Sequence, residues 1–324
     1  MTVRVAVLDD YQRVARQYAD WDQLDAEVVV FDDHVADRDE LVRRLEPFDV
    51  VAVMRERTPL PRAVLEALPR LKLLVTTGMR NAAIDTTAAS ELGITVSGTG
   101  AGGDPRLAWA PTAELTWGLL LALVRGIPEQ DRSIRDGGWQ RGIGVELAGR
   151  TFGLLGLGRL GAQVATVARA FGMHVLAWSQ NLTDEAAEQA GARRVAKREL
   201  FAESDVVSIH TVLSDRTRGV VGAEEIGLLG PDGYLINTSR GPVVDEPALR
   251  RALREGRIAG AGIDVFEREP LPADDPWRST PRTVLTPHIG YVTEGTYASF
   301  YPETAEAIGA YLAGEPIRVL NRTS

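Results

Sequence analysis

The stretch TFGLLGLGRLGAQVATVARAFGMHVLAW, Thr151–Trp178, decides the fold of this chain. An apolar run leads into a glycine-rich turn, a proline-free amphipathic segment follows, and a second apolar run closes the stretch. In such a βαβ unit the first glycine makes the tight turn, the second leaves room for a pyrophosphate, and the third lets the helix pack on the strand. The helix N-terminus then faces the phosphates. We therefore predict a Rossmann unit that binds a dinucleotide, lined by Gly156, Gly158, Arg159, Leu160 and Gly161.

The same glycine spacing occurs a second time, at Gly98, Gly100 and Gly103. This second match lies in the turn-rich segment SGTGAGGDP, Ser97–Pro105, and leads into a long helical region without a strand before Thr151. Because a dinucleotide site needs a strand before the turn and a helix after it, context excludes this match. We interpret Ser97–Pro105 as a linker.

Short β-branched runs alternate with helical patterns on both sides of this linker. Alternation of this kind indicates parallel sheets covered by helices on both faces. We predict an α/β fold with two doubly wound parallel-sheet domains. The predicted strands are residues 3–8, 26–31, 49–54, 72–77, 151–155, 174–178, 205–210, 233–238, 258–265 and 283–286. Long helical regions are predicted from about Pro111 to Ile134 and at the C-terminal end.

The bulk composition narrows the function classes. The 324 residues suffice for two domains, and their formal net charge of −9 disfavours a nucleic-acid or anionic-membrane partner. The chain has no cysteine, which excludes disulfides, thiol nucleophiles and thiolate-bound metals, and we predict no metal site. The longest apolar run is too short to span a bilayer. We expect a cytoplasmic protein.

Charged side chains follow three of the predicted strands in the second half. Arg240 follows the strand in YLINTSRG, and His288 follows the strand in VLTPHIG. In AGIDVFEREP, Asp264 stands at the end of the strand and Glu269 lies five residues further on. Ligands bind outside the carboxyl ends of strands in open α/β sheets. Each residue alone could be an ordinary surface or core residue. An arginine, an acid and a histidine at one sheet edge, beside a dinucleotide site, predict a catalytic site.

The ordered motifs GLGRLG, NTSRG, DVFEREP and TPHIG closely resemble those of the D-isomer-specific 2-hydroxyacid dehydrogenases. This group includes phosphoglycerate dehydrogenase, glyoxylate/hydroxypyruvate reductase and D-lactate dehydrogenase. The resemblance covers nearly the whole chain. It implies a flavodoxin-like substrate domain made of residues 1–101 and 290–324, with a Rossmann domain of residues 102–289 inserted. It also implies a homodimer and a hydride transfer between NAD(P) and C2 of a 2-oxo acid or D-2-hydroxy acid.

The resemblance also implies a role for individual residues. Arg240 would grip the substrate carboxylate and carbonyl oxygen, His288 would be the general acid, and Glu269 would orient the imidazole. Asp264 would meet the nicotinamide carboxamide. The remaining residues implied on the cofactor side are Thr112, His210 and Thr238.

One loop departs from the family pattern G-x-G-x-D-N-x-D. This chain has GMRNAAID, Gly78–Asp85, with Arg80 at the second glycine. A further segment, MRERT, places Arg55 and Arg57 after another strand. These three arginines would add positive charge near the bound substrate. We therefore predict a small-molecule substrate with a second anionic or strongly polar group. The residues predicted to bind this substrate are Arg55, Arg57, Gly78, Met79 and Arg80.

The cofactor type depends on the segment HVLAWSQNLT. Ser179 stands 18 residues after Gly161, where an NAD-specific relative would hold an acid against the ribose hydroxyls. Ser179 and Gln180 can hydrogen-bond either a hydroxyl or a 2′-phosphate, and no arginine follows them. We therefore predict weak discrimination between NAD and NADP.

Two other functions fit the same motifs. A dinucleotide-sensing binding protein, of the corepressor type, would keep the same charged residues. Phosphite-dehydrogenase-like chemistry also uses an arginine, a glutamate and a histidine. Activity with a panel of 2-oxo acids would discriminate among these functions.

Overall fold

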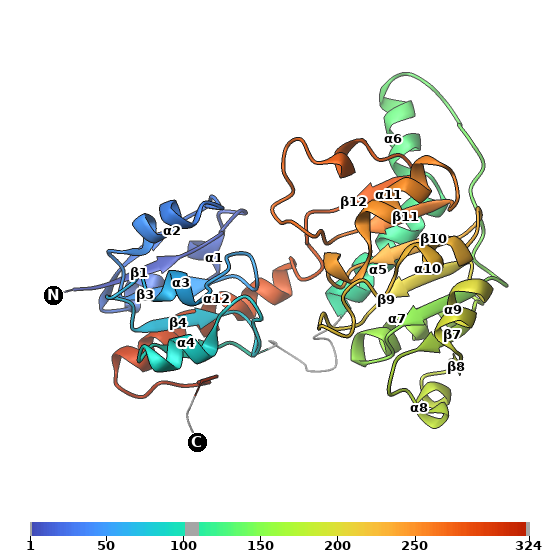
Figure 1. Cartoon of the computed structure of the whole chain (residues 1–324). Helices are drawn as coiled ribbons and strands as arrows, with labels where there is room; N and C mark the ends of the chain where they lie inside the picture. The colour runs from blue at the N-terminus through green and yellow to red at the C-terminus, as the bar shows by residue number, and fades with distance from the viewer. Residues whose placement is uncertain (1, 101–109, 322–324) are drawn as a thin grey trace. The chain divides into compact units, whose positions relative to one another are not determined.

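The computed structural model describes residues 2–100 and 110–321. The chain divides into two compact units: unit 1 is Met1–Ala108 with Val292–Ser324, and unit 2 is Trp109–Tyr291. Each unit contains one parallel sheet with helices around it (Figure 1), which confirms the predicted fold class. The predicted domain boundary at 101/102 and Gly103 of the linker lie outside the described residues.

Unit 1 is built on a five-stranded sheet in the order β2-β1-β3-β4-β5. This is the flavodoxin-like order, in which ligands bind where the strand order reverses beside the first strand. Its strands are β1 (Val3–Val7), β2 (Ala26–Val30), β3 (Val50–Val53), β4 (Leu73–Thr76) and β5 (Thr95–Gly98). Its helices are α1 (Ala15–Tyr18), η1 (Trp21–Gln23), α2 (Arg38–Leu45), α3 (Arg62–Leu65), α4 (Thr86–Glu91) and α12 (Glu294–Leu312).

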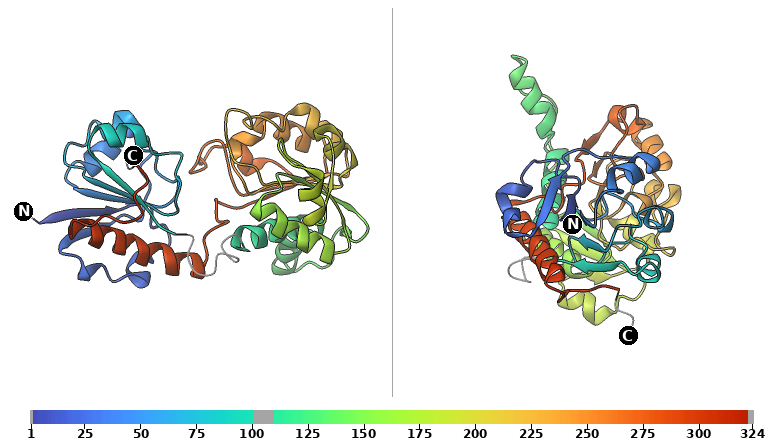
Figure 2. Two further views of the ribbon diagram at one scale, coloured as in Figure 1. Left: turned by 90° about the horizontal axis from the view of Figure 1, so that it is seen from below. Right: turned by 90° about the vertical axis from the view of Figure 1, so that its left-hand side faces the viewer.

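Strand β5 corrects the sequence analysis, because its last two residues lie in the segment interpreted as a linker. The strand pairs in parallel with β4 on one side. On the other side, Ser97 forms an antiparallel bridge with Val319, and the Leu320 N–H donates to the Val96 carbonyl at 2.7 Å. The C-terminal segment therefore completes this edge of the sheet. Helix α12 packs on β4 and β5, beneath the sheet in Figure 2.

Unit 2 contains a seven-stranded parallel sheet in the order β12-β11-β10-β9-β6-β7-β8. Six of these strands have the Rossmann order, and β12 extends the sheet by one strand. The strands are β6 (Thr151–Leu155), β7 (His174–Trp178), β8 (Arg193–Arg194), β9 (Val206–Ile209), β10 (Tyr234–Asn237), β11 (Gly260–Ile263) and β12 (Thr283–Leu285). The two-residue strand β8 is absent from the sequence prediction.

Helices cover both faces of this sheet. Successive strand residues point to opposite faces, so Leu154 packs in one apolar cluster and Leu155 in the other. The first cluster lies under α5 (Ala110–Val124) and α7 (Arg159–Ala170). The second lies under α9 (Lys197–Glu203), α10 (Ala223–Leu228) and α11 (Glu246–Arg254). The remaining elements are α6 (Ile127–Arg135), α8 (Asp184–Gln189), η2 (Gly241–Val243) and η3 (Pro276–Ser279).

The predicted long helical region is two helices. Helix α5 ends at Val124, and Gly126 takes a left-handed conformation with φ of 59° before α6 begins. Helix α6 then projects from the body of unit 2 (Figure 2). Within residues 2–100 and 110–321, no helix combines the length and the apolar character that a bilayer crossing requires.

Candidate active site

The three predicted glycines form the turn between β6 and α7. Gly156 has φ of +103°, and a Cβ there would lie 2.6 Å from the carbonyl oxygen of His210. A Cβ on Gly161 would overlap the carbonyl of Gly156, so this glycine lets α7 pack closely. A Cβ on Gly158 would meet nothing within 4 Å. The space at Gly158, at the N-terminus of a 12-residue helix, fits a phosphate group. Arg159 and Leu160 form the first residues of that helix.

His210 lies directly after β9, and its backbone packs against Gly156 of the glycine turn. Its Nε2 atom is 2.9 Å from the hydroxyl of Ser208. Its Nδ1 atom is enclosed and has no hydrogen-bond partner among the described residues. Burial lowers the pKa of His210 from 6.5 to about 3, so the ring is neutral.

Ser179 and Gln180 follow β7, at the edge where the turn lies. Ser179 is half-buried and Gln180 is exposed. The neighbouring strand β8 supplies two arginines, but Arg194 pairs with Asp184 at 3.3 Å. Arg193 pairs with two glutamates of α9 at 2.8 Å each. Both guanidinium groups therefore already have carboxylate partners.

Thr112 lies on α5 of unit 2, and Thr238 and Asp264 lie directly after β10 and β11. The hydroxyl of Thr112 donates to the Gly290 carbonyl at 2.9 Å, and Asp264 accepts the Gly290 N–H at 3.0 Å. Thr238 is linked to α5 by a 2.9 Å hydrogen bond with Thr116. The structure thus brings together three of the residues predicted on the cofactor side.

The backbone of His288 is fixed by Asp264. His288 has a left-handed φ of 54°, and its N–H donates to the Asp264 carbonyl at 2.7 Å. The Asp264 side chain accepts hydrogen bonds from the Thr286 hydroxyl at 2.6 Å and the Ile289 N–H at 2.9 Å. Burial raises the pKa of this carboxyl group. The loop of residues 286–290 is thereby held in one conformation after β12.

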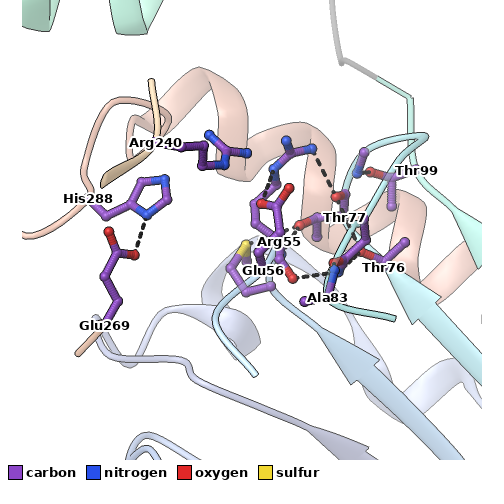
Figure 3. A network of polar contacts seen from close by, with 12 residues as sticks. Arg55, Glu56, Thr76, Thr77, Ala83, Thr99, Arg240, Glu269 and His288 are labelled. Atoms are coloured by element: carbon purple, nitrogen blue, oxygen red, sulfur yellow. Dashed lines mark hydrogen bonds and ion pairs between the residues drawn. The ribbon is translucent and has the colours of Figure 1, made fainter. Parts of the chain in front are cut away.

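Glu269 and His288 form a directly bonded pair. The Nδ1 atom of His288 lies 2.6 Å from Oε2 of Glu269, and Oε1 accepts the N–H of Phe266 at 2.8 Å. Glu269 approaches the ring from the side opposite to Arg240 (Figure 3). The pair follows two adjacent parallel strands, β11 and β12. Nε2 is then the ring nitrogen that remains for a ligand.

Arg240 follows β10 and is held at its backbone. Asn237 donates to the Arg240 carbonyl at 3.1 Å and accepts the Ser239 N–H at 3.0 Å. One guanidinium nitrogen donates to the Ser239 carbonyl at 2.7 Å. The side chain is half-buried, with its guanidinium group near the His288 ring in Figure 3. An arginine, a carboxylate and a histidine thus lie at the carboxyl edge of the unit 2 sheet.

Arg55 follows β3 of unit 1 and lies against the predicted substrate loop. Its guanidinium occupies the space where a Cβ on Gly78 would be, and it donates to the Thr77 carbonyl at 3.3 Å (Figure 3). It also lies 3.7 Å from the carboxylate of Glu56. Both distances are long for a charged group, so these contacts are weak.

Arg57 has a different environment from Arg55. One guanidinium nitrogen donates to the carbonyl of Asp9 at 2.6 Å, and another donates to the Tyr297 hydroxyl at 3.2 Å. The guanidinium also lies over the ring of Tyr11, 4.5 Å from its centre. Arg57 thus connects the segment after β1 with α12.

The loop of Gly78, Met79 and Arg80 follows β4. The Gly78 N–H donates to the hydroxyl of Thr99 at 2.8 Å. Within residues 2–100 and 110–321, the N–H groups of Met79 and Arg80 make no hydrogen bond, and the Arg80 side chain has no ion-pair partner. Both residues are exposed. Unit 1 therefore presents two backbone donors and one guanidinium at this strand end.

Several site residues were not predicted from the sequence. Thr286 holds Asp264, Thr99 holds the substrate loop, and Glu246 contacts the turn that carries Glu269. Thr286 and Thr99 each come directly after a strand. From the sequence, however, Thr286 was predicted inside the last strand, and no strand was predicted before Thr99. Glu246 begins a helix, and nothing in the sequence around it points to the turn.

Comparison with known proteins identifies the same family that the sequence motifs resemble. The model for the NAD-binding domain of D-isomer-specific 2-hydroxyacid dehydrogenases matches residues 117–290. A glyoxylate reductase from Aeropyrum pernix is 38% identical over 269 residues, which are 80% of this chain and 79% of that protein. A D-3-phosphoglycerate dehydrogenase from Methanocaldococcus jannaschii is 37% identical over 281 residues, 86% of this chain but only 52% of that protein.

A solved structure extends the similarity to the fold. The phosphoglycerate oxidoreductase from Vibrio cholerae has a TM-score of 0.90 and 35% identity, covering 97% of this chain and 100% of that one. The resemblance inferred from the motifs is confirmed. This chain belongs to the D-isomer-specific 2-hydroxyacid dehydrogenase family.

Proposed function

We propose that this protein is an NAD(P)-dependent oxidoreductase that transfers a hydride between nicotinamide and C2 of a 2-oxo acid or D-2-hydroxy acid. The observation that carries the proposal is the 2.6 Å contact between His288 and Glu269, on the same sheet edge as Arg240. Unit 2 is proposed to be the dinucleotide-binding domain. Unit 1 is proposed to be the substrate domain.

The residues around Gly158 fit a dinucleotide, because the backbone there leaves open space in front of a helix N-terminus. We assign the pyrophosphate to Gly156, Gly158, Arg159, Leu160 and Gly161, with His210 supporting the turn. Ser179 and Gln180 are assigned to the adenine-side ribose. Thr112, Thr238 and Asp264 are assigned to the nicotinamide end. The nicotinamide, when bound, supplies or accepts the hydride.

The chain's own residues handle the substrate and the proton. Arg240 would bind the substrate carboxylate and stabilise negative charge on the C2 oxygen. His288 would give the Nε2 proton to that oxygen during reduction and take it back during oxidation. Glu269 would keep Nδ1 protonated and the ring in one orientation, which leaves Nε2 directed at the substrate.

A second anionic group on the substrate would bind at the strand ends of unit 1. Arg55 has only weak contacts, and Arg80 has no ion-pair partner among the described residues. The N–H groups of Met79 and Arg80, next to Gly78, would bind the substrate carboxylate and not the second anionic group. We assign Arg57 to holding the loop after β1, since its donors bind Asp9 and Tyr297.

We also propose weak discrimination between NAD and NADP. Ser179 carries no charge that would repel a 2′-phosphate, and the two arginines of β8 are already paired with acids. The ratio of kcat/KM values for NADH and NADPH should stay below about a hundredfold, which corresponds to about 3 kcal/mol. A larger ratio would show this part of the proposal to be wrong.

A homodimer is proposed from the surface of α6 and the segment after it. Four large apolar side chains are exposed there, including Trp139 at 72% and Ile143 at 99%. The other two are Ile127 and Ile134. A contiguous exposed apolar patch marks a protein interface, and we propose that these four side chains form one. Light scattering of Ile143→Glu should give the monomer mass where the unaltered chain gives the dimer mass.

The central test is the oxidation of reduced cofactor by a panel of 2-oxo acids. The panel contains glyoxylate, hydroxypyruvate, pyruvate and 2-oxoglutarate, each with NADH and with NADPH. At least one acid should be reduced, and His288→Asn should lower kcat by about 10²–10⁴-fold. Cofactor binding without turnover of any acid would contradict the proposal and favour a sensing function. Turnover of phosphite alone would also contradict it.

A further inference from the structure

A buried carboxylate lies behind the turn that carries Glu269. Glu246 is the first residue of α11 and is only 7% exposed. Its Oε1 accepts the backbone N–H of Glu267 at 2.6 Å. Its Oε2 accepts the indole N–H of Trp277 at 2.8 Å and lies 3.4 Å from a guanidinium nitrogen of Arg250. This side chain therefore links α11 to the turn after β11 and to η3.

Further contacts fix this peptide group and the one before it. Gly241 packs so closely on the Phe266–Glu267 peptide that a Cβ there would overlap it. The Phe266 N–H donates to Oε1 of Glu269 at 2.8 Å. A buried glutamate and a glycine next to Arg240 thus fix the Phe266–Glu267 peptide, and Glu269 fixes the Val265–Phe266 peptide directly before it.

Burying the Glu246 carboxylate lowers the free energy of unfolding. Burial disfavours the charged carboxylate and raises the pKa of Glu246. Replacing buried polar groups by well-packed apolar ones is often neutral or stabilising. What the carboxylate supplies, and an apolar group could not, is two hydrogen bonds of fixed direction to two separate segments.

We propose that Glu246 is a positioning residue for the proton-transfer pair. By holding the N–H of Glu267, it fixes the 266–269 turn in the conformation that presents Glu269 to Nδ1 of His288. Glu246 does not contact the His288 ring and is proposed to act only through this turn. The inference rests on the proposed roles of Glu269 and His288.

The test compares Glu246→Gln and Glu246→Ala with a matched control. Glutamine has one acceptor oxygen, so it can receive only one of the two N–H groups, and its amide would face the other donor. The control is Glu225→Gln. Glu225 is also buried in unit 2 and binds a backbone N–H at 2.9 Å and Lys197 at 2.7 Å, but it lies on α10.

Two readouts are measured on the full chain. The first is the low-field proton NMR signal of the hydrogen-bonded imidazole N–H, assigned to His288 by its loss in His288→Asn; the chain has only four histidines. The second is kcat for 2-oxo acid reduction beside KM for the cofactor. We expect both Glu246 variants to lose or broaden the signal and to lower kcat about tenfold or more, with KM for the cofactor unchanged. Glu225→Gln should keep the signal and kcat.

Retention of the signal and of kcat in both Glu246 variants would overturn the inference. Equal losses in the Glu246 and Glu225 variants would also overturn it, because they would indicate general destabilisation. The NMR comparison requires no turnover. An inactive but folded protein would therefore refute the proposed function while the signal still decides the role of Glu246.

Discussion

The Nδ1 atom of His288 lies 2.6 Å from Oε2 of Glu269, and the opposite carboxylate oxygen is held by the N–H of Phe266. The carboxylate can only accept, so Nδ1 must donate. This contact fixes the ring and leaves Nε2 for the substrate. The same carboxylate thus has both oxygens engaged, one by backbone and one by the imidazole.

Glu269→Gln should lower kcat for 2-oxo acid reduction by about 10–100-fold. Glutamine fills the same space, but it removes the negative charge beside Nδ1 and can turn an amide N–H instead of an acceptor oxygen toward it. Steady-state kinetics at saturating cofactor measure the effect, and the unfolding midpoint serves as the control for folding. An unchanged kcat in a stable variant would contradict the proposed role.

Gly158→Ala and Gly161→Ala should have opposite consequences. At Gly158 a methyl group meets no protein atom and φ is −90°, so the fold tolerates alanine while the pyrophosphate loses its space. We expect NADH affinity to fall about tenfold or more, about 1.4 kcal/mol, at unchanged stability. At Gly161 the methyl group overlaps the Gly156 carbonyl, which should cost about 1–3 kcal/mol of stability. Calorimetric titration and thermal unfolding distinguish the two, and equal affinity in Gly158→Ala would argue against this cofactor site.

Arg80→Met and Arg57→Met should separate substrate binding from support of the fold. Arg80→Met should lower kcat/KM about tenfold or more for a 2-oxo acid with a second anionic group, because a charged hydrogen bond contributes about 1.5–3 kcal/mol. The effect on glyoxylate should be small. Arg57→Met should lower the free energy of unfolding, since the Asp9 carbonyl and the Tyr297 hydroxyl each lose the hydrogen bond from the guanidinium group. Equal effects of Arg80→Met on both acids would remove Arg80 from the distal contact.

The stability of the protein should depend on pH through His210. Its pKa is about 3 in the folded state and 6.5 without burial, so below pH 6.5 the unfolded chain binds a proton that the folded chain does not. Stability from this group is complete above the unfolded value and falls as pH decreases toward 3. Between about pH 7 and pH 5 the loss is about 2 kcal/mol.

Chemical unfolding at several pH values tests this dependence. His210→Gln should flatten the curve in that window. His174→Gln should not, because His174 is exposed at the start of β7. If the free energy of unfolding falls equally with decreasing pH in His210→Gln and in the unaltered chain, another group causes the loss of stability in acid.

The sequence predicted the elements whose hydrogen bonds and apolar contacts are encoded locally. Strands β6 and β7 match the prediction residue for residue, since apolar runs and the glycine turn delimit them. Strands β5 and β8 were missed. Strand β5 depends on the distant segment around Val319 for its outer edge, and the two residues of β8 carry no strand signal.

The candidate site also contains residues that the sequence predicts and residues that it does not. Residues at strand ends, such as Arg240 and His288, are predictable because parallel strands bring their carboxyl ends to one edge. The supports behind them are not, because they depend on packing between elements far apart in sequence. Glu246 contacts Glu267 from 21 residues away, and Arg57 binds Tyr297 from 240 residues away.

Unit 1 contains both ends of the described chain, while unit 2 is continuous. During synthesis on the ribosome, the first hundred residues emerge long before α12 and the segment that bonds to β5. All strands of the unit 2 sheet come from one uninterrupted stretch of the chain. Unit 2 can therefore fold while the chain is still being made, and the sheet of unit 1 reaches its final form only after translation has passed Val319.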